Sequence, residues 1–180
     1  MALSNIYLRL ITLSGPVIGE GLLEGWETAI ELKDFSWGIE AELHQKGSLS
    51  VGGLLGMGKN VSVQMQPLKF TKRFDIASSQ IHFCVDNKIK VISATITVLH
   101  MKPGFIPPHA PGFVLNCADG YFESAELELG TDGNMAELTE TVTVNFKLMQ
   151  MLYMKPVTGA NGQPVPTAPF FYPNPVVGAP

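Results

Sequence analysis

A glycine-rich segment has the spacing of a nucleotide-binding loop. Gly53 to Lys59 matches the GxxxxGK pattern, in which backbone amides cradle phosphates at the start of a helix. The next residue is Asn60, where the pattern requires a Ser or Thr for Mg²⁺. The following residues, 61–65, alternate between apolar and polar as a strand does. We therefore interpret 53–59 as a flexible loop that binds no nucleotide.

Two pairs of titratable residues have spacings that could hold a metal or move a proton. His82 and Asp86 lie four residues apart and would share a helix face, but the sequence offers no third ligand nearby. Glu126 and Glu128 alternate with leucines, which is typical of a solvent-facing strand surface and less so of an acid and base pair. Neither pair therefore predicts a metal site or an active site.

Single nucleophiles give no stronger signal. Cys84 falls on the apolar stripe of a predicted helix, and Ser36 has neither a glycine-flanked elbow nor a base beside it. The sequence predicts no catalytic residue, no metal ligand and no cofactor. We expect that the protein is not an enzyme.

The composition instead suggests self-association. Apolar residues make up 46% of the 180 residues and charged residues 16%, so much of the surface must be neutral or covered by protein. The net charge is −4 and basic residues cluster only at Lys69, Lys72 and Arg73, which we expect to form a surface beside a helix. This distribution gives no basic stripe for nucleic acid.

Features of the chain indicate where it folds. Two cysteines, Cys84 and Cys117, do not make a disulfide framework in a chain of this size. Residues 1–5 lack the features of a signal peptide, and no apolar run approaches the roughly 18 residues of a membrane helix. We expect folding in the cytoplasm, no membrane insertion, and any export to proceed without a signal peptide.

Phase slips in the strand pattern predict a barrel. Ile30 and Leu32 share one face, whereas Phe35 and Trp37 continue the apolar pattern one residue out of phase, which calls for a bulge near 33–34. A similar slip follows residues 61–65, with Pro67 at the break. Bulges bend strands, and bent strands allow a sheet to close.

One helix is expected after these strands. Asp75 is a plausible N-cap and Asn87 a plausible end, and between them apolar residues recur at the spacing of a buried stripe: Ala77, Ile81, Cys84 and Val85. The predicted fold is mainly β, a closed β-barrel of bent antiparallel strands with one short flanking α-helix.

The last predicted strand, 139–154, is longer than the molecule is wide. It would span about 50 Å if straight, against about 40 Å for a compact domain of this size. Near its end Met149, Met151 and Tyr153 make the formerly polar face apolar, so we expect these residues to contact a neighbouring subunit. The barrel domain is assigned to 1–155, and 156–180 is an uncharged Pro-rich extension expected to lie against its own barrel or an adjacent subunit.

Several motifs, in their order and spacing, resemble the haemolysin co-regulated protein (Hcp) family, the tube subunits of the bacterial type VI secretion system. They cover nearly the whole chain up to about Pro156: Ala29-Ile30-Glu31-Leu32 before Phe35-Ser36-Trp37-Gly38, then Gly58-Lys59, Leu68-Lys69-Phe70-Thr71-Lys72 with Asp75, and Leu138 to Phe146. The resemblance implies a secreted, self-assembling protein of six-membered rings that stack into a tube. It also implies a surrounding contractile sheath, a capping spike protein and small effectors carried in the bore for delivery.

The resemblance leads to expectations about surfaces. If Phe35 and Trp37 face the barrel core, Ser36 faces away, and in a ring that face would line the bore. The loop 47–59 would reach a neighbouring subunit through residues that are costly to expose to water: Leu49, Val51, Leu54, Leu55 and Met57. Two alternatives remain open, a phage-type tail tube subunit and a monomeric small-molecule-binding β-barrel.

Overall fold

The structure, a computed structural model, describes residues 5–44, 60–99, 111–132, 135–155, 165–166 and 170–173. Within these ranges the strands are β1 (Ile6–Thr12), β2 (Gly15–Val17), β3 (Ile30–Ser36), β4 (Ile39–His44), β5 (Asn60–Met65), β6 (Leu68–Arg73), β7 (Lys90–Leu99), β8 (Pro111–Asp132), β9 (Met135–Lys155), β10 (Val165–Pro166) and β11 (Phe170–Pro173), and the helix is α1 (Ile76–Asp86).

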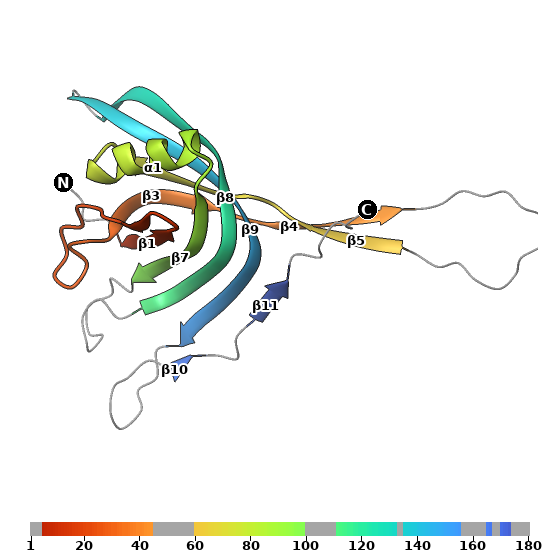
Figure 1. The fold of residues 1–180 in the computed structure, drawn as a ribbon. Helices are drawn as coiled ribbons and strands as arrows, with labels where there is room; N and C mark the ends of the chain where they lie inside the picture. The colour runs from red at the N-terminus through yellow and green to blue at the C-terminus, as the bar shows by residue number, and fades with distance from the viewer. Residues whose placement is uncertain are drawn as a thin grey trace, which may run out of the picture.

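Six of the described strands close into an antiparallel barrel (Figure 1). Their order is β9-β6-β3-β1-β7-β8, and β8 pairs back with β9 along most of its length. The predicted fold class is therefore confirmed. Apolar side chains from all six strands and from α1 meet in one core cluster inside the barrel, which includes Leu8, Ile30, Phe70, Ile81, Ile96, Leu115 and Val144.

The bulge predicted in β3 is present. Its pairing with β6 shifts register between Leu32 and Asp34. Leu32 is buried, and after the shift Phe35 and Trp37 pack against the core cluster, as the phase slip predicted.

The slip at Pro67 has a different outcome from the expected bulge. One strand ends at Met65 and the next begins at Leu68, and the facing chain breaks likewise between Ser36 and Ile39. The two segments beyond these breaks form a separate two-stranded sheet, β4 with β5, which extends away from the barrel (Figure 1). The sequence pattern shows a change of face but does not distinguish a bulge from a strand end.

The helix follows its predicted signals. Asp75 caps α1 by accepting a hydrogen bond from Ala77 N, and Ser78 completes a capping box by binding the backbone N–H of Asp75. Asn87 is the C-cap, and Ala77, Ile81 and Cys84 are buried.

The long hairpin of β8 and β9 curves round the barrel and overhangs it. β8 is one continuous strand and accommodates Asp119 at a φ of 54°. The buried face switches at the same level of both strands, from Cys117 to Gly120 in β8 and from Phe146 to Met149 in β9. Gly120 is required there because a Cβ would lie 2.5 Å from the Phe146 ring.

Candidate assembly surfaces

In the part of the chain that the structure describes, the candidates for chemistry are not brought together. Among the described residues, no three His, Cys, Asp or Glu side chains are grouped to hold a metal ion. His82 lies with Glu140 and not with Asp86: its Nε2 is 2.9 Å from Glu140 Oε1, although the contact lacks good hydrogen-bond geometry. The segment 53–59 lies outside the described residues. No helix within the described ranges is long and apolar enough to cross a membrane.

Both cysteines are buried in the barrel domain. Cys84 lies on the inner face of α1, as the helical stripe predicted. Burial raises the pKa of Cys117 to about 12. The environment of Cys117 therefore disfavours its thiolate.

Ser36 is the last residue of β3 and its side chain is exposed, while its neighbours Phe35 and Trp37 pack on the core. It pairs with Lys69, which is also exposed. The Ser36 side chain thus faces away from the core, as predicted. Its location in a bore remains a proposal.

The predicted loop contacts lie outside the described residues: Leu49, Val51, Leu54, Leu55 and Met57. The structure describes the two strands on either side of this segment in the sequence. β4 and β5 pair residue by residue from Ile39 opposite Met65 to His44 opposite Asn60. β4 and β5 therefore form a two-stranded ribbon that extends away from the barrel (Figure 1), and the segment 45–59 joins these two strands in the sequence.

The three residues near the end of β9 that we expected to contact a neighbour differ in how far they are buried. Met149 belongs to the barrel's own core and is 3% exposed, which corrects the expectation for this residue. Met151 is half-buried against the same core, and Tyr153 is 52% exposed. The cause is the switch of buried face after Phe146, which exchanges the inner and outer sides of the strand.

A buried charge network joins α1 to β6 and β9. Lys72 is fully buried, and its Nζ donates to Glu140 Oε2 at 3.1 Å, to Ser78 Oγ at 2.8 Å and to the carbonyl of Arg73 at 2.7 Å. Asp75 Oδ1 is 2.7 Å from the same nitrogen. Ser78 Oγ also donates to Glu140 Oε2 at 2.9 Å.

This network is a feature that our sequence analysis missed, because we assigned Lys72 to a surface with Lys69 and Arg73. The signal was present: Lys72 shares its strand face with Leu68 and Phe70, and Glu140 shares its face with Val142 and Val144, all of them buried. Every N–H of the Lys72 ammonium has an acceptor, which a buried cation needs. The network therefore fixes the helix against the closing strand.

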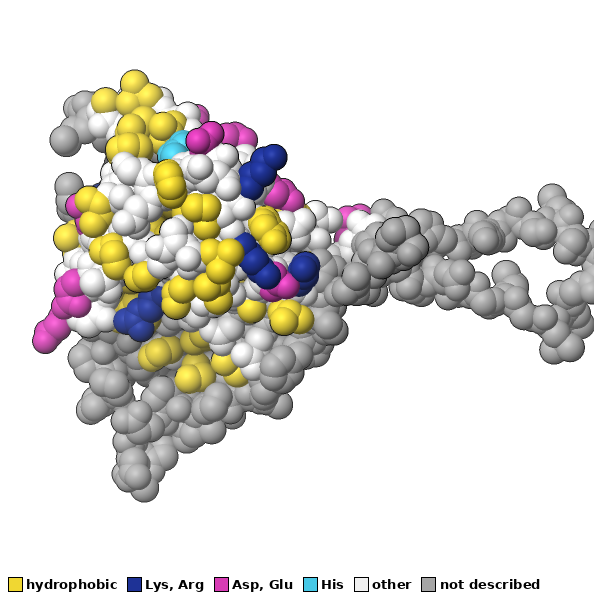
Figure 2. Space-filling model, in the orientation of Figure 1, with side chains coloured by type: hydrophobic (Ala, Val, Ile, Leu, Met, Phe, Trp, Pro, Cys, Tyr) yellow, Lys and Arg dark blue, Asp and Glu magenta, His cyan; other side chains and the backbone are white. Residues whose placement is uncertain are grey.

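Figure 2 shows apolar side chains spread over the visible face of the molecule, with charged side chains among them. At the overhanging end of β8 and β9, Leu127, Leu129 and Leu138 are 49%, 72% and 38% exposed, and Phe74 beside them is 45% exposed. We call these four residues the apolar tip. Glu126 and Glu128 occupy the other face of β8 and are exposed, as expected for a solvated surface.

Asp119 forms ion pairs with two lysines on the outer surface. Asp119 Oδ2 lies 3.2 Å from Lys147 Nζ, and Asp119 Oδ1 lies 2.5 Å from Lys90 Nζ. Hydrogen bonds from Lys90 and then Lys147 hold the pKa of Asp119 below its usual value. Such exposed pairs contribute little to stability.

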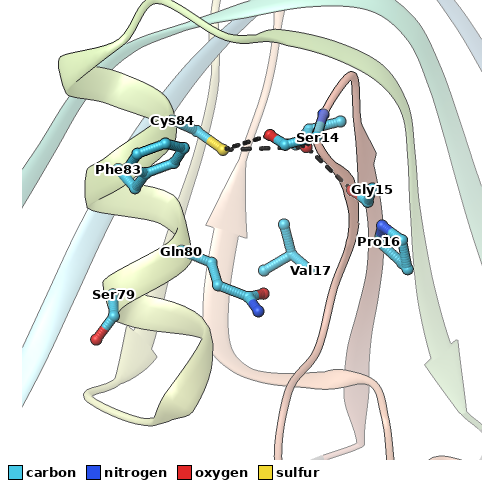
Figure 3. A pocket seen from close by; sticks show the side chains of 9 residues that line it. Ser14, Gly15, Pro16, Val17, Ser79, Gln80, Phe83 and Cys84 are labelled. Carbon is cyan, nitrogen blue, oxygen red and sulfur yellow. Dashed lines mark hydrogen bonds between the residues drawn. The ribbon is translucent and has the colours of Figure 1, made fainter.

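A cavity of about 250 Å³ lies between α1 and the β1–β2 turn (Figure 3). Its lining includes Ser14, Gln80, Phe83 and Cys84, and no residue of the lining is charged. Cys84 Sγ is 3.9 Å from Ser14 Oγ, and Gln80 Oε1 accepts from the backbone of Ile18. Val17 belongs both to the lining of this cavity and to the core cluster.

Comparison with known families and structures identifies related proteins. A family model described as "Type VI secretion system effector, Hcp" matches residues 7–153. No curated protein sequence matches the chain.

Solved structures share the fold at low sequence identity. A type six secretion system protein is 18% identical with a TM-score of 0.72, covering 93% of this chain and 94% of that chain. Hcp1 from Salmonella typhimurium is 19% identical with a TM-score of 0.61, covering 94% and 95%. A chain of the anti-feeding prophage baseplate is 12% identical with a TM-score of 0.50, covering 85% and 95%.

Proposed function

Since the chain belongs to the Hcp family of the type VI secretion system, we propose that it is a structural subunit of that system's inner tube. The observation that carries this proposal is the family match over residues 7–153, together with a closed barrel whose core is filled with side chains. One cluster of buried apolar side chains from all six barrel strands favours a structural role over the small-molecule-binding alternative.

The proposed assembly is a homo-hexameric ring, and rings stack into the tube. The apolar tip supports self-association, because large exposed apolar side chains at one end of a monomer are costly to leave in water. The β4–β5 ribbon supports contact between subunits, since it projects from the barrel and carries the apolar residues of 47–59. Ser36 is proposed to face the bore, where small effectors would ride.

The remaining partners follow from the family. We propose that a contractile sheath surrounds the tube, that a spike protein caps it, and that the subunit folds in the cytoplasm before it is secreted through this system. We propose that residues 1–155 form the barrel domain and that residues 156–180 are a C-terminal extension of it.

A phage-type tail tube subunit is the second candidate, and the similarity to a chain of the anti-feeding prophage baseplate favours it. Both candidates use the same architecture. Pull-down of the assembled protein with its sheath and spike partners distinguishes them, because each particle has its own set.

The mass of the purified protein in solution tests the proposal. We expect native mass spectrometry to give six chain masses, and negative-stain microscopy to show rings with a central hole. A protein that stays monomeric at every concentration, without rings in any image, contradicts the assignment to a tube.

A further inference from the structure

One edge of β9 loses its barrel neighbour partway along. β6 begins at Leu68, opposite Val144, and none of the other described barrel strands pairs with this edge of β9 beyond that point. β8 covers only the other edge, as far as Tyr153. The backbone N–H and C=O groups of this stretch would therefore stand open for pairing.

The open stretch has a composition that favours pairing between molecules. Residues 148–154 contain no charge and no proline, and Leu148 and Tyr153 are 51% and 52% exposed. Short uncharged segments on an exposed edge are the usual sites of strand-to-strand aggregation. Lys147 and Lys155 flank the segment directly, as charged residues often flank such strands.

Two short strands of the C-terminal extension occupy this edge. β11 pairs antiparallel with β9 from Phe170 opposite Met151 to Pro173 opposite Leu148. β10 pairs Val165 with Lys155 and Pro166 with Met154. Figure 1 shows both strands beside the lower half of β9.

The covering strands are poorly suited to accept a further strand themselves. Pro166 and Pro173 lie within them, and Pro164, Pro169 and Pro175 flank them in the sequence. Proline has no N–H to donate and is confined to the edges of sheets. The extension thus ends the sheet at an edge where β9 alone could pair with a further strand.

We propose that β10 and β11 form a strand cap, which holds the edge of β9 from Leu148 to Lys155 and prevents the same edge of a second copy from pairing with it. This role explains why a proline-rich, uncharged extension is attached to a barrel domain. It concerns the single chain, and it stands whether or not the rings of the proposed function form.

Proline variants of the full-length chain test the cap directly. In an antiparallel strand, adjacent residues direct their N–H groups to opposite sides, so only one of Phe171 and Tyr172 donates toward β9. We expect one of Phe171→Pro and Tyr172→Pro to release the cap and the other to retain it, and each serves as the control for the other. If the backbone amides of both variants exchange hydrogen at the same rates as those of the unmodified chain, the proposal is overturned.

Hydrogen exchange measured by mass spectrometry gives the readout. In the releasing variant, about half of the amides in 148–154 should exchange at least about tenfold faster, because alternate N–H groups of β9 face the cap and the rest remain bonded to β8. Peptides from β1 and β7 should keep their protection. Faster exchange throughout the barrel would instead mean general destabilisation and would count against a cap.

A truncation ending at Gln163 tests the consequence for association. We expect light scattering from this variant to rise with concentration well above that of the full chain. Adding Leu148→Lys to the truncation should restore the behaviour of the full chain, since a charge on the edge blocks pairing. A truncated protein that behaves like the full chain in scattering and in exchange rejects the cap.

Discussion

Lys72 and Glu140 are both fully buried, and they are bonded to each other across 68 positions of sequence. A buried ion pair adds little net stability compared with apolar residues of the same volume, but loss of one member leaves an unpaired charge in the core. Ser78, Asp75 and the backbone carbonyl of Arg73 supply the remaining partners of Lys72. At the residue scale, these four side chains fix the position of the helix on the barrel.

We predict that Lys72→Met or Glu140→Leu alone lowers the free energy of unfolding by about 3–5 kcal/mol, and that the double variant loses less than either. Urea titration at fixed protein concentration measures this, because assembly itself adds stability. Lys69→Met on the same strand is the control and should change stability by no more than about 0.5 kcal/mol, since Lys69 is exposed. Equal effects at both lysines would contradict the role of the network.

Gly120 is constrained by the ring that it faces. We predict that Gly120→Ala destabilises by about 1–3 kcal/mol, because the new methyl group would lie 2.5 Å from the Phe146 ring and 2.8 Å from the carbonyl oxygen of Asn145. Gly130→Ala is the matched control, as a Cβ there meets nothing within 4 Å. Thermal unfolding of both variants makes the comparison, and similar melting temperatures would count against the packing argument.

At the scale of elements, local signals located the helix well. Asp75 and Asn87 were predicted as its ends from residue type alone, and both caps are present. The bulge in β3 was likewise predicted from a change of face and appears between Leu32 and Asp34. These features depend on neighbours within a few residues, so the sequence carries them directly.

The cap of α1 can be separated from the charge beside it. Asp75→Asn keeps an oxygen for the N–H of Ala77 but loses the charge near Lys72, whereas Asp75→Ala loses both. We predict that Asp75→Ala is less stable than Asp75→Asn by about 1 kcal/mol, which is the contribution of the cap. Chemical denaturation of the two variants gives the difference, and identical stabilities would show that the cap contributes nothing.

At the scale of the whole molecule, the ribbon of β4 and β5 is the proposed arm between subunits. Replacing 45–59 with an Asn-Gly turn, which suits a two-residue hairpin, should leave the barrel folded and yield monomers. Size-exclusion chromatography with light scattering measures the oligomer, and circular dichroism monitors the fold. Changing only Leu49, Val51, Leu54, Leu55 and Met57 to Ser keeps the length and should also weaken the rings. Intact rings in both variants would contradict the proposed role of the β4–β5 ribbon in contact between subunits.

The bore is tested at Ser36. We predict that Ser36→Gln lowers the amount of effector that co-purifies with the rings, because a longer side chain would narrow the proposed bore at six places in each ring. Ser79→Gln, the same change at an exposed position of α1, is the control. Unchanged effector retention with intact rings would show that Ser36 does not line the bore.

The sequence by itself determined the faces of strands, the caps of the helix and the absence of a motif for catalysis, because side-chain period and capping are local. It assigned Lys72 to the surface with Lys69 and Arg73, and only the structure shows that Lys72 is buried and paired with Glu140. Only the tertiary structure decided that β9 closes on both β6 and β8, that Met149 turns into the core, and that the C-terminal extension covers the edge of β9. Periodicity fixes which way a side chain points, whereas the neighbouring strand is chosen by closure of the sheet over the whole chain.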